Sequence, residues 1–375
     1  MKAVVLNYFD TYEDRVDLVH EFFKGQGYEV TVVQSDFRHF KKVHREEQKE
    51  GFTFVKSRPY YKNLSIARLI SHYKFSSNAF EIVEEIKPDL LYVFVPPNSL
   101  AKFASKYKKK NKEVKLILDI IDLWPETMPI GNAKKLPPFT FWGEMRNKSL
   151  KYANIVITEC DLYQSVLSEV LKGIKVETVY LAKKEINVIS NSQLSEDEIH
   201  LAYLGSINNI IDISKIKEII YAIKAIKPVT LHIIGNGEKK QELIDESKSA
   251  GATIEYYGEL YNPQEKQNVF DKCHFGINIM KDTVCVGLTM KSIDYLQGGL
   301  PLLNNINYDT ERLVEAHSLG ININNFKYTE DLAEVITKSN INYYLNMKVN
   351  TRESFQRNFS TQAFFKKLSN ITMKL

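Results

Sequence analysis

The chain has 375 residues, of which 44% are hydrophobic and 26% are charged, a balance typical of globular proteins and not of disordered ones. This length is sufficient for two domains, and the formal net charge is only +4. The longest apolar runs are far too short to cross a bilayer. Three cysteines, Cys160, Cys273 and Cys285, lack metal-ligand spacing and fit a reducing compartment. The composition therefore predicts a soluble cytoplasmic protein with no metal site.

Short β-branched runs alternate with helical patterns along most of the chain. The first run, at the N-terminus, has no cleavage-site pattern, so we interpret it as a strand and not as a signal peptide. Such alternation predicts parallel sheets covered by helices on both faces. The expected strands, in chain order, are Lys2–Leu6, Glu29–Val33, Leu90–Val95, Val114–Asp119, Ile155–Thr158, Val176–Tyr180, His200–Leu204, Thr230–Ile234, Thr253–Tyr257, Phe275–Ile279, Leu302–Leu303 and Gly320–Ile323.

The polar segment KKEINVISNSQLSEDEI, residues 183–199, separates the first six strands from the last six. We therefore predict an α/β protein of two doubly wound, Rossmann-like domains, at residues 1–182 and 200–350, facing across a cleft. In open α/β sheets the carboxyl ends of the strands line the usual ligand crevice. The tail, residues 351–375, has a helical pattern and is expected to pack back on one domain, for example the N-terminal one.

Positive charge is concentrated in residues 51–150, which hold 17 Lys/Arg against 9 Asp/Glu. The densest run is KKKNKEVK at 108–115, and aromatic residues crowd the stretch 52–63. One interpretation is a solvated helix end and loop; the other is docking to an anionic membrane surface or a phosphorylated substrate. Nucleic acid is not expected as a partner, because no recognition motif accompanies the charge.

Glycines follow three of the expected strands of the second domain, at Gly205, Gly235 and Gly258. A glycine at such a position lets the backbone approach a ligand closely or adopt a positive φ. The Gly235-Asn236-Gly237 sequence lacks the third glycine of a dinucleotide-binding fingerprint, since Lys240 stands in its place. A nicotinamide cofactor is therefore not expected.

The stretch GLTMKSIDYLQGGLPLL, residues 287–303, predicts a short helix with a polar start. Thr289 is expected to cap a helix that begins near Met290, and Gly298 to end it at the C′ position. Free backbone N–H groups and the positive end of the helix dipole would then face the loop 287–290. This arrangement predicts an anion site suited to a diphosphate.

Two lysines and one acid complete this predicted site. Lys291, in the first turn, and Lys281, before the loop, would add countercharge without a metal. Asp294 lies about one turn, roughly 5 Å, further along the helix. A carboxylate there can accept hydrogen bonds from the two hydroxyls of a ribose. The alternative for Asp294 is an ordinary exposed polar position.

The string KSIDYLQGGLPLL, residues 291–303, resembles the element "PSKxxEYLAxGxPVI" of family 4 nucleotide-sugar glycosyltransferases, which have the GT-B fold. The resemblance covers most of residues 1–325, and its motifs occur in the family's order. The other matching stretches are GYEVTVVQSDFRH (27–39), KPDLLYVFVPP (87–97), LILDIIDLWPET (116–127), YANIVITECD (152–161), AYLGS (202–206), LHIIGNGEKKQEL (231–243) and IEYYGEL (254–260).

The resemblance implies transfer of a sugar from a nucleoside diphosphate, with retention of configuration and with neither a metal nor another cofactor. It implies catalytic roles for Lys291, which would hold the leaving group, and for Asp122, which would contact sugar or acceptor hydroxyls; the alternative for Asp122 is a loop or helix cap. The donor-binding residues that it implies are Gly205, Ser206, Gly235, Gly258, Glu259, Leu260, Lys281, Gly287, Leu288, Thr289, Met290 and Asp294.

Three positions depart from the family pattern. Gly287 stands where many members have a glutamate that contacts the donor sugar, although one subgroup shares this glycine. Ser206 replaces a phosphate-binding arginine, and Ile121 replaces a sugar-binding histidine. These departures leave Lys281 and Lys291 as the remaining candidates for phosphate contact.

On the acceptor side, Arg15 is expected either to face an acceptor phosphate or to pair with Asp14 or Glu13 on a helix surface. His39, His44 and His72 are expected to be surface or packing residues.

The leading hypothesis is a cytoplasmic glycosyltransferase at the inner face of the membrane that uses a nucleotide sugar, with UDP favoured, to extend a lipid-linked glycan for a bacterial capsule or exopolysaccharide. The alternatives are a nucleotide-sugar epimerase or hydrolase, and a degenerate scaffold that partners an active enzyme.

Overall fold

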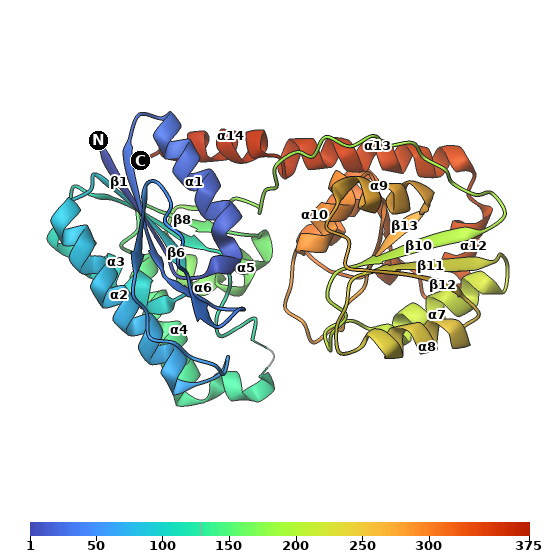
Figure 1. Ribbon diagram of the computed structural model, residues 1–375, viewed down its shortest axis with the longest axis horizontal. Helices are drawn as coiled ribbons and strands as arrows, with labels where there is room; N and C mark the ends of the chain where they lie inside the picture. Colours follow the sequence, from blue (N-terminus) through green and yellow to red (C-terminus); the bar gives the residue numbers. More distant parts are fainter. Residues whose placement is uncertain (129) are drawn as a thin grey trace. The chain divides into compact units, whose positions relative to one another are not determined.

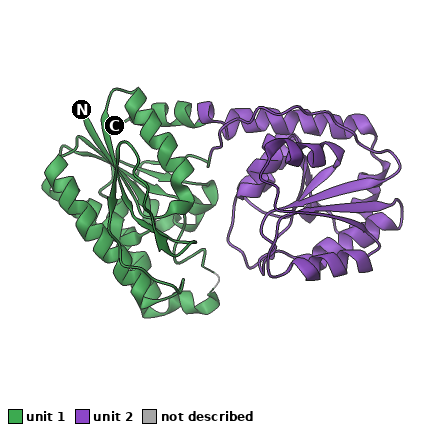
Figure 2. Ribbon diagram, in the orientation of Figure 1, with its two compact units in different colours: residues 1–181, 364–375 green, residues 182–363 purple. Residues whose placement is uncertain are grey.

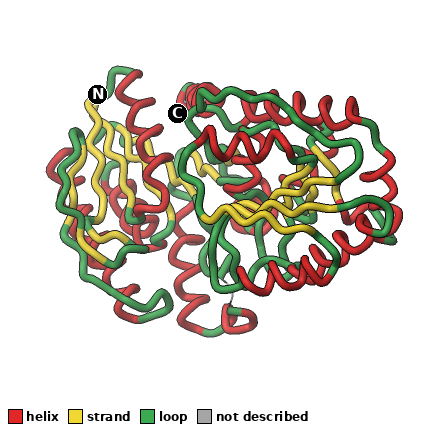
Figure 3. The backbone as a smooth tube through the Cα atoms, turned by 45° about the vertical axis from the view of Figure 1, so that its right-hand side comes forward, coloured by secondary structure: helices red, strands yellow, loops and turns green. Residues whose placement is uncertain are grey.

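The computed structural model describes residues 1–128 and 130–375, and this part of the chain divides into two compact units (Figures 1 and 2). Unit 1 comprises residues 1–181 and 364–375, and unit 2 comprises residues 182–363. The chain therefore leaves unit 1 after Leu181 and returns to it at Phe364, within the C-terminal helix α14 (Thr361–Thr372). Within each unit the strands form a layer with helices packed against it (Figure 3).

Unit 1 contains a parallel sheet with the strand order β5-β2-β1-β6-β7-β8-β9. Every side chain of β6 is buried, as expected for a parallel strand covered on both faces. A separate antiparallel pair joins β3 (Phe37–Arg38) and β4 (Val43–His44). The sheet strands are β1 (Lys2–Asn7), β2 (Glu29–Ser35), β5 (Phe52–Val55), β6 (Leu90–Val95), β7 (Lys115–Ile120), β8 (Ile155–Thr158) and β9 (Val176–Thr178). The helices are η1 (Asp10–Tyr12), α1 (Glu13–Gly25), α2 (Ile66–Ile86), α3 (Asn98–Lys110), η2 (Gly131–Lys135), α4 (Pro137–Leu150), α5 (Asp161–Val166) and α6 (Ser168–Leu171).

Unit 2 contains a second parallel sheet, with the order β12-β11-β10-β13-β14-β15. Its core is rich in isoleucine and leucine from the strands and from α7. The strands are β10 (Ile199–Leu204), β11 (Val229–Ile234), β12 (Thr253–Gly258), β13 (Phe275–Asn278), β14 (Leu302–Asn304) and β15 (Gly320–Asn322). The helices are α7 (Ile213–Lys224), α8 (Lys240–Ser249), α9 (Pro263–Lys272), α10 (Met290–Gln297), α11 (Asp309–His317), η3 (Ile323–Asn325), α12 (Thr329–Lys338) and α13 (Ile341–Asn358).

Each sheet reverses its strand order beside its first strand. In unit 1, β1 lies between β2 and β6, and in unit 2, β10 lies between β11 and β13. This is the doubly wound, Rossmann-like arrangement predicted from the sequence, and it is confirmed for both units. The crevice at such a reversal lies outside the carboxyl ends of the strands. The loops that follow β1 and β6 in unit 1, and β10 and β13 in unit 2, therefore flank these crevices.

All twelve predicted strands are present, with ends that differ by a few residues at most. The prediction missed β5 and the β3–β4 pair, because these short segments lie in the basic, aromatic-rich part of the chain, where the hydrophobic alternation is weak. β5 pairs only with β2, at the edge of the sheet.

A buried ion pair joins α1 to the centre of the unit 1 sheet. The Arg15 guanidinium donates from Nε and Nη2 to the two carboxylate oxygens of Asp119 on β7, at 2.9 and 3.1 Å, and from Nη1 to the Tyr180 carbonyl at 3.0 Å. The Tyr92 hydroxyl donates to the same carboxylate at 2.6 Å. Arg15 is only 2% exposed and Asp119 is fully buried. Both expectations for Arg15 were therefore wrong, because its guanidinium is buried against Asp119 and pairs with neither Asp14 nor Glu13. The sequence did not reveal this partner, since Asp119 lies 104 residues from Arg15.

The C-terminal helix packs against the same region of unit 1. The Phe364 ring lies 5.2 Å from the Arg15 guanidinium, and Phe365 contacts Phe22 of α1 with ring centroids 5.8 Å apart. Glu177 on β9 receives ion pairs from Lys367, at 3.3 Å, and from Lys374. Aromatic packing and two ion pairs thus attach the end of the chain to the first unit.

Replacing Asp119 with Asn is expected to destabilise the protein by about 3–5 kcal/mol, because it leaves the Arg15 charge buried without its anion. The control is Lys172→Met, which breaks the exposed Lys172–Glu169 pair and is expected to cost less than about 1 kcal/mol. Urea unfolding followed by tryptophan fluorescence measures both, since Trp124 and Trp142 lie in unit 1. Equal, small losses in the two variants would contradict this account of the ion pair.

Candidate functional site

The glycine loops of unit 2 contact one another through their backbones. The Gly205 N–H donates to the Ile234 carbonyl at 2.9 Å, and the Gly235 N–H donates to the Gly258 carbonyl at 2.7 Å. A Cβ atom on Gly235 would lie 2.0 Å from the Gly205 carbonyl oxygen, so the neighbouring loop itself requires a glycine there. Gly205 and Gly258 also have positive φ, but a Cβ on either would meet nothing within 4 Å. Open space therefore adjoins Gly205 and Gly258, whereas Gly235 serves the packing of the loops.

Helix α10 begins as the sequence predicted. The Thr289 hydroxyl accepts a hydrogen bond from the Ser292 N–H at 3.1 Å, which confirms the N-cap. The Gly287 carbonyl accepts hydrogen bonds from both the N–H and the hydroxyl of Thr310, at 2.9 and 2.7 Å. The first two helical N–H groups, of Met290 and Lys291, have no acceptor within the helix. Helix α10 therefore has a fixed N-terminus, where two backbone N–H groups can donate hydrogen bonds to a ligand.

The helix ends one residue later than expected. Gly298 keeps a right-handed φ of −76°, and Gly299, at +71°, is the left-handed C′ residue. The Leu300 N–H donates to the Tyr295 carbonyl at 2.8 Å, and the Gly299 N–H to the Leu296 carbonyl at 3.1 Å. These two bonds form a Schellman motif. The prediction that Gly298 is the C′ residue was therefore wrong, because the second of the two glycines takes the left-handed conformation.

Lys291 is half-buried as a residue, but its ammonium group is buried. Among the described residues, none forms a hydrogen bond or ion pair with its ammonium group, and Nζ is inaccessible to solvent. The ammonium lies 5.0 Å from the centre of the Tyr203 ring on β10. The Tyr203 hydroxyl donates to the Ser206 carbonyl at 2.9 Å, which places Lys291 close to the loop after β10. Burial lowers the pKa of Lys291 to about 7.

Asp294 is held by two lysines that the sequence did not reveal as its partners. Lys183, from the segment before β10, contacts Oδ2 at 2.7 Å, and Lys266 of α9 contacts Oδ1 at 3.1 Å. The carboxylate is only 16% exposed. Asp294 is therefore a charged group fixed by two neighbours and not a freely exposed polar residue.

The remaining predicted donor residues of unit 2 differ in burial. Leu288 is buried, and Met290 is 43% exposed. Ser206 and Lys281 are exposed, and Leu260 is half-buried. Glu259 is exposed and accepts a hydrogen bond from the Tyr261 hydroxyl at 2.5 Å.

In unit 1 the loop after β7 carries Asp122 in a largely buried position. One carboxylate oxygen accepts hydrogen bonds from the Leu123 N–H, at 2.8 Å, and from the Thr127 hydroxyl, at 2.7 Å. The other oxygen has a long contact, 3.4 Å, from the Tyr12 hydroxyl, and the Trp124 side chain also hydrogen-bonds to the carboxylate. Burial raises the pKa of Asp122. The capping role is thus present, and it gives one oxygen two short hydrogen bonds, whereas the Tyr12 contact to the other is long.

Side chains of α3 and α4 hold the loop that carries Asp122. Arg146 of α4 is fully buried and contacts both carboxylate oxygens of Glu126, at 2.6 and 3.0 Å. It also donates to the Trp124 carbonyl at 2.9 Å, as does the Asn98 side chain at 3.0 Å. This network keeps the loop in one conformation.

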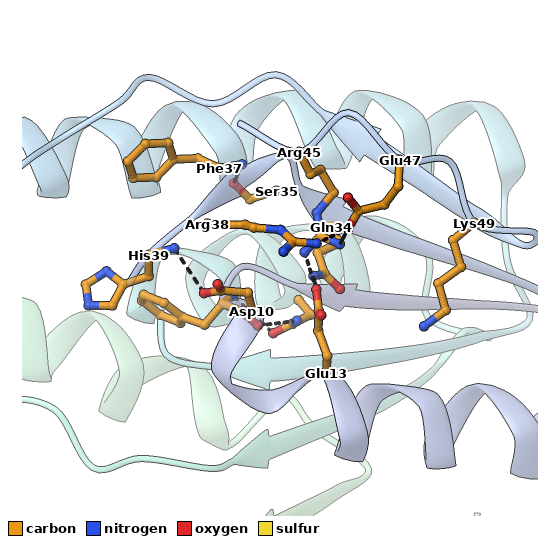
Figure 4. A network of polar contacts seen from close by, with 12 residues as sticks. Asp10, Glu13, Gln34, Ser35, Phe37, Arg38, His39, Arg45, Glu47 and Lys49 are labelled. Atoms are coloured by element: carbon orange, nitrogen blue, oxygen red, sulfur yellow. Dashed lines mark hydrogen bonds and ion pairs between the residues drawn. The ribbon is translucent and has the colours of Figure 1, made fainter. Parts of the chain in front are cut away.

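The segment after β1 anchors the loops that follow β2 (Figure 4). The Asp10 carboxylate accepts from the His39 N–H at 3.0 Å. The Glu13 carboxylate accepts from Gln34 at 2.6 Å and from Arg45. Of the three histidines expected at the surface or in packing, His39 and His72 are buried and His44 is exposed, where it contacts Asp36 at 2.9 Å.

The described part of the chain contains no group of three or more His, Cys, Asp or Glu side chains placed to hold a metal ion. None of its helices combines the length and apolar character needed to cross a bilayer.

Comparisons with known proteins give likeness in structure but not in sequence. No protein-family model matches the chain, and no curated protein matches it in sequence. The solved structures that align over the whole chain include sucrose-phosphate synthase from Thermosynechococcus elongatus (TM-score 0.71, 12% identity, 99% of that chain), the lipopolysaccharide outer core galactosyltransferase WaaB (0.67, 13%, 100%) and Anabaena HepE in complex with UDP and glucose (0.64, 11%, 100%). The chain thus has the fold of these glycosyltransferases, two Rossmann-like α/β units of the GT-B type.

Proposed function

We propose that this chain is a glycosyltransferase that moves a sugar from a nucleoside diphosphate sugar, with UDP favoured, to a hydroxyl of a glycan acceptor, with retention of configuration. The observation that carries the proposal is Lys291, whose buried amine lies in the first turn of α10 and has no partner among the described residues. An amine in such a place is stabilised by an anion that binds beside it. The N–H groups of Met290 and Lys291 offer that anion two further donors.

In the proposed reaction the bond between the anomeric carbon and the diphosphate oxygen breaks, and the acceptor oxygen forms the new bond and loses its proton. The diphosphate leaves with increased negative charge. Groups that bind this charge more strongly in the transition state than in the ground state accelerate the step. Lys291 and the start of α10 perform this role without a metal ion, and Asp122 offers a carboxylate oxygen to a sugar or acceptor hydroxyl.

Asp294 is proposed to accept hydrogen bonds from the ribose. Lys183 and Lys266 fix the position of its carboxylate, which preorganises an acceptor pair for two adjacent hydroxyls. The open sides of Gly205 and Gly258 leave room for the donor nearby.

The acceptor is proposed to be lipid-linked, with unit 1 contacting an anionic membrane at its inner face. An apolar patch, formed by the exposed side chains of Phe40, Tyr61, Leu64 and Ile66, supports this proposal; their exposures are 69%, 74%, 54% and 77%. Lys42 donates to the Asn63 side chain at 2.9 Å, so the two loops that carry the patch adjoin. The exposed Lys41, Arg58 and Lys62 lie on the same loops. Apolar side chains interleaved with lysine and arginine favour an anionic membrane surface.

The stability of the unliganded protein should depend on pH through Lys291. Its folded pKa of about 7 lies below the unfolded value of about 10.4, so the unfolded state binds more protons between these pH values. The free energy of unfolding therefore rises with pH from about 7 to about 10. In Lys291→Met this part of the rise is expected to disappear, whereas Lys281→Met, at an exposed lysine, should keep it. Denaturant unfolding at several pH values measures the difference, and parallel curves for wild type and Lys291→Met would refute it.

Donor binding tests the site directly. Calorimetry against UDP-, GDP- and dTDP-sugars is expected to show binding of at least one donor, weakened about 10- to 100-fold in Lys291→Met because a charge-assisted contact is lost. Asp294→Ala should also weaken binding, and the exposed Lys248→Met is the matched control. Unchanged donor affinity in Asp294→Ala would remove the ribose assignment.

The same experiment separates the alternatives. With the bound donor, release of free nucleoside diphosphate is expected only when a glycan acceptor is added. Turnover without acceptor would favour an epimerase or hydrolase. Absence of binding to every donor would favour the scaffold, for which the replacements at Ser206, Ile121 and Gly287 are the supporting observation.

Membrane contact is tested by sedimentation with vesicles. The wild-type protein is expected to bind vesicles containing phosphatidylserine and not neutral phosphatidylcholine vesicles, with binding that falls as salt increases. The triple change Phe40→Ser, Tyr61→Ser, Ile66→Ser should abolish it. The control replaces two exposed apolar residues of unit 2, Tyr221→Ser and Tyr256→Ser. Equal binding by the two multiple variants would argue against the patch.

A further inference from the structure

A second buried cation without an anionic partner lies in unit 1. Arg68, in the first turn of α2, is 5% exposed. Its Nη1 donates to the Asn63 carbonyl at 2.7 Å, while Nε is buried and has no hydrogen-bond partner among residues 1–128 and 130–375. No carboxylate oxygen in the described part of the chain lies within 4.0 Å of a guanidinium nitrogen of Arg68, the distance that defines an ion pair. Two other buried arginines differ, since Arg15 and Arg146 each contact both oxygens of a carboxylate.

Aromatic rings hold the Arg68 guanidinium in place. It lies 4.2 Å from the Trp124 ring centre, 5.4 Å from that of Phe9 and 5.7 Å from that of Tyr60. Stacking on rings fixes the plane of a guanidinium but does not neutralise its charge. The N–H groups in that plane match the spacing of two oxygens on one phosphate.

Further unsatisfied or basic groups surround the same point. His72, one turn along α2 from Arg68, is 1% exposed, and neither of its ring nitrogens has a partner. Its ring stacks on Trp124 with an interplanar angle of 19°. The Lys42 ammonium lies 4.8 Å from the centre of the Tyr60 ring. The nearby acid Asp10 is engaged by the His39 N–H (Figure 4). Asp122 also interacts electrostatically with Arg68, but its carboxylate is held by the Leu123 N–H and the Thr127 hydroxyl and forms no ion pair with the guanidinium. The cluster therefore offers donors and positive charge with no direct anionic contact to Arg68 among the described residues.

We propose that Arg68, together with His72 and Tyr60, forms a binding subsite for a phosphate group. The cluster adjoins two features that identify the ligand. Trp124 belongs to the loop that carries Asp122, and Leu64 and Ile66 of the apolar patch flank the start of α2. A phosphate held by Arg68 thus lies beside both the candidate catalytic loop and the apolar surface. The identification of this phosphate as the one that links lipid to sugar in the acceptor rests on the proposed function; the anion site itself does not.

Tryptophan fluorescence of the full-length protein reports on this subsite without any donor or turnover. The chain has two tryptophans, Trp124 and Trp142, whose ring centroids lie 5.7 Å apart in this cluster. Titration with sodium pyrophosphate, at ionic strength held constant with NaCl, is expected to change the emission saturably. Arg68→Gln should abolish the change, whereas Arg357→Gln, at an exposed arginine of α13, should retain it. A change of equal size and affinity in Arg68→Gln would overturn the proposal.

Two additions keep the test decisive. Should Arg68→Gln fail to fold by circular dichroism, Arg68→Lys replaces it; this variant keeps the charge but loses the planar fork, and it should bind pyrophosphate at least tenfold more weakly. Unaltered affinity in Arg68→Lys would count against the subsite. Monomeric decyl phosphate distinguishes the sources: tighter binding than inorganic phosphate indicates a lipid phosphate, and equal binding indicates a free phosphate at the same subsite. Because no nucleotide sugar is present, failure of the proposed transfer reaction leaves this result unaffected.

Discussion

Both units depend on parallel strands that are buried on both faces, and this burial decides where charge is tolerated. A charge buried inside such a sheet is costly unless it is paired. In the first sheet the carboxylate of Asp119 is paired with Arg15 and accepts a further hydrogen bond from Tyr92. Helices cover the two faces of such a sheet, so polar groups that serve a ligand are left to the strand ends. Asp122 lies in the loop after β7, and Lys291 and Asp294 lie on α10, the helix that follows β13.

Against this background Lys291 and Arg68 form a pair of the same kind, one in each unit. Each is a buried cation for which the described residues provide no carboxylate. Each rests on aromatic rings: Lys291 on Tyr203, and Arg68 on Trp124. Such contacts recover only part of the cost of desolvating a charge. In the proposed reaction a ligand anion would supply what the fold omits, and a donor diphosphate and an acceptor phosphate are its two anions.

The sequence predicted what depends on local pattern and missed what depends on distant partners. Strand periodicity located the sheets, and the Thr289 cap followed from its neighbours in the chain. The partners of Asp294 and Arg15 did not, because Lys183 lies 111 residues from Asp294 and Asp119 lies 104 residues from Arg15. No sequence motif singles out Arg68. Only the folded structure shows that no carboxylate among the described residues pairs with it.

The unpaired cations also bear on whether the chain is an enzyme or a scaffold. A scaffold that binds no anion gains nothing from a buried ammonium or guanidinium, and apolar residues of similar size at these places would be neutral or stabilising. The losses at Ser206 and Gly287 remove side chains from the donor site, yet Lys291, the helix N–H groups and the fixed Asp294 carboxylate are still in place. A site that retains a costly buried charge despite these replacements fits the proposed binding of an anionic donor better than it fits a degenerate fold.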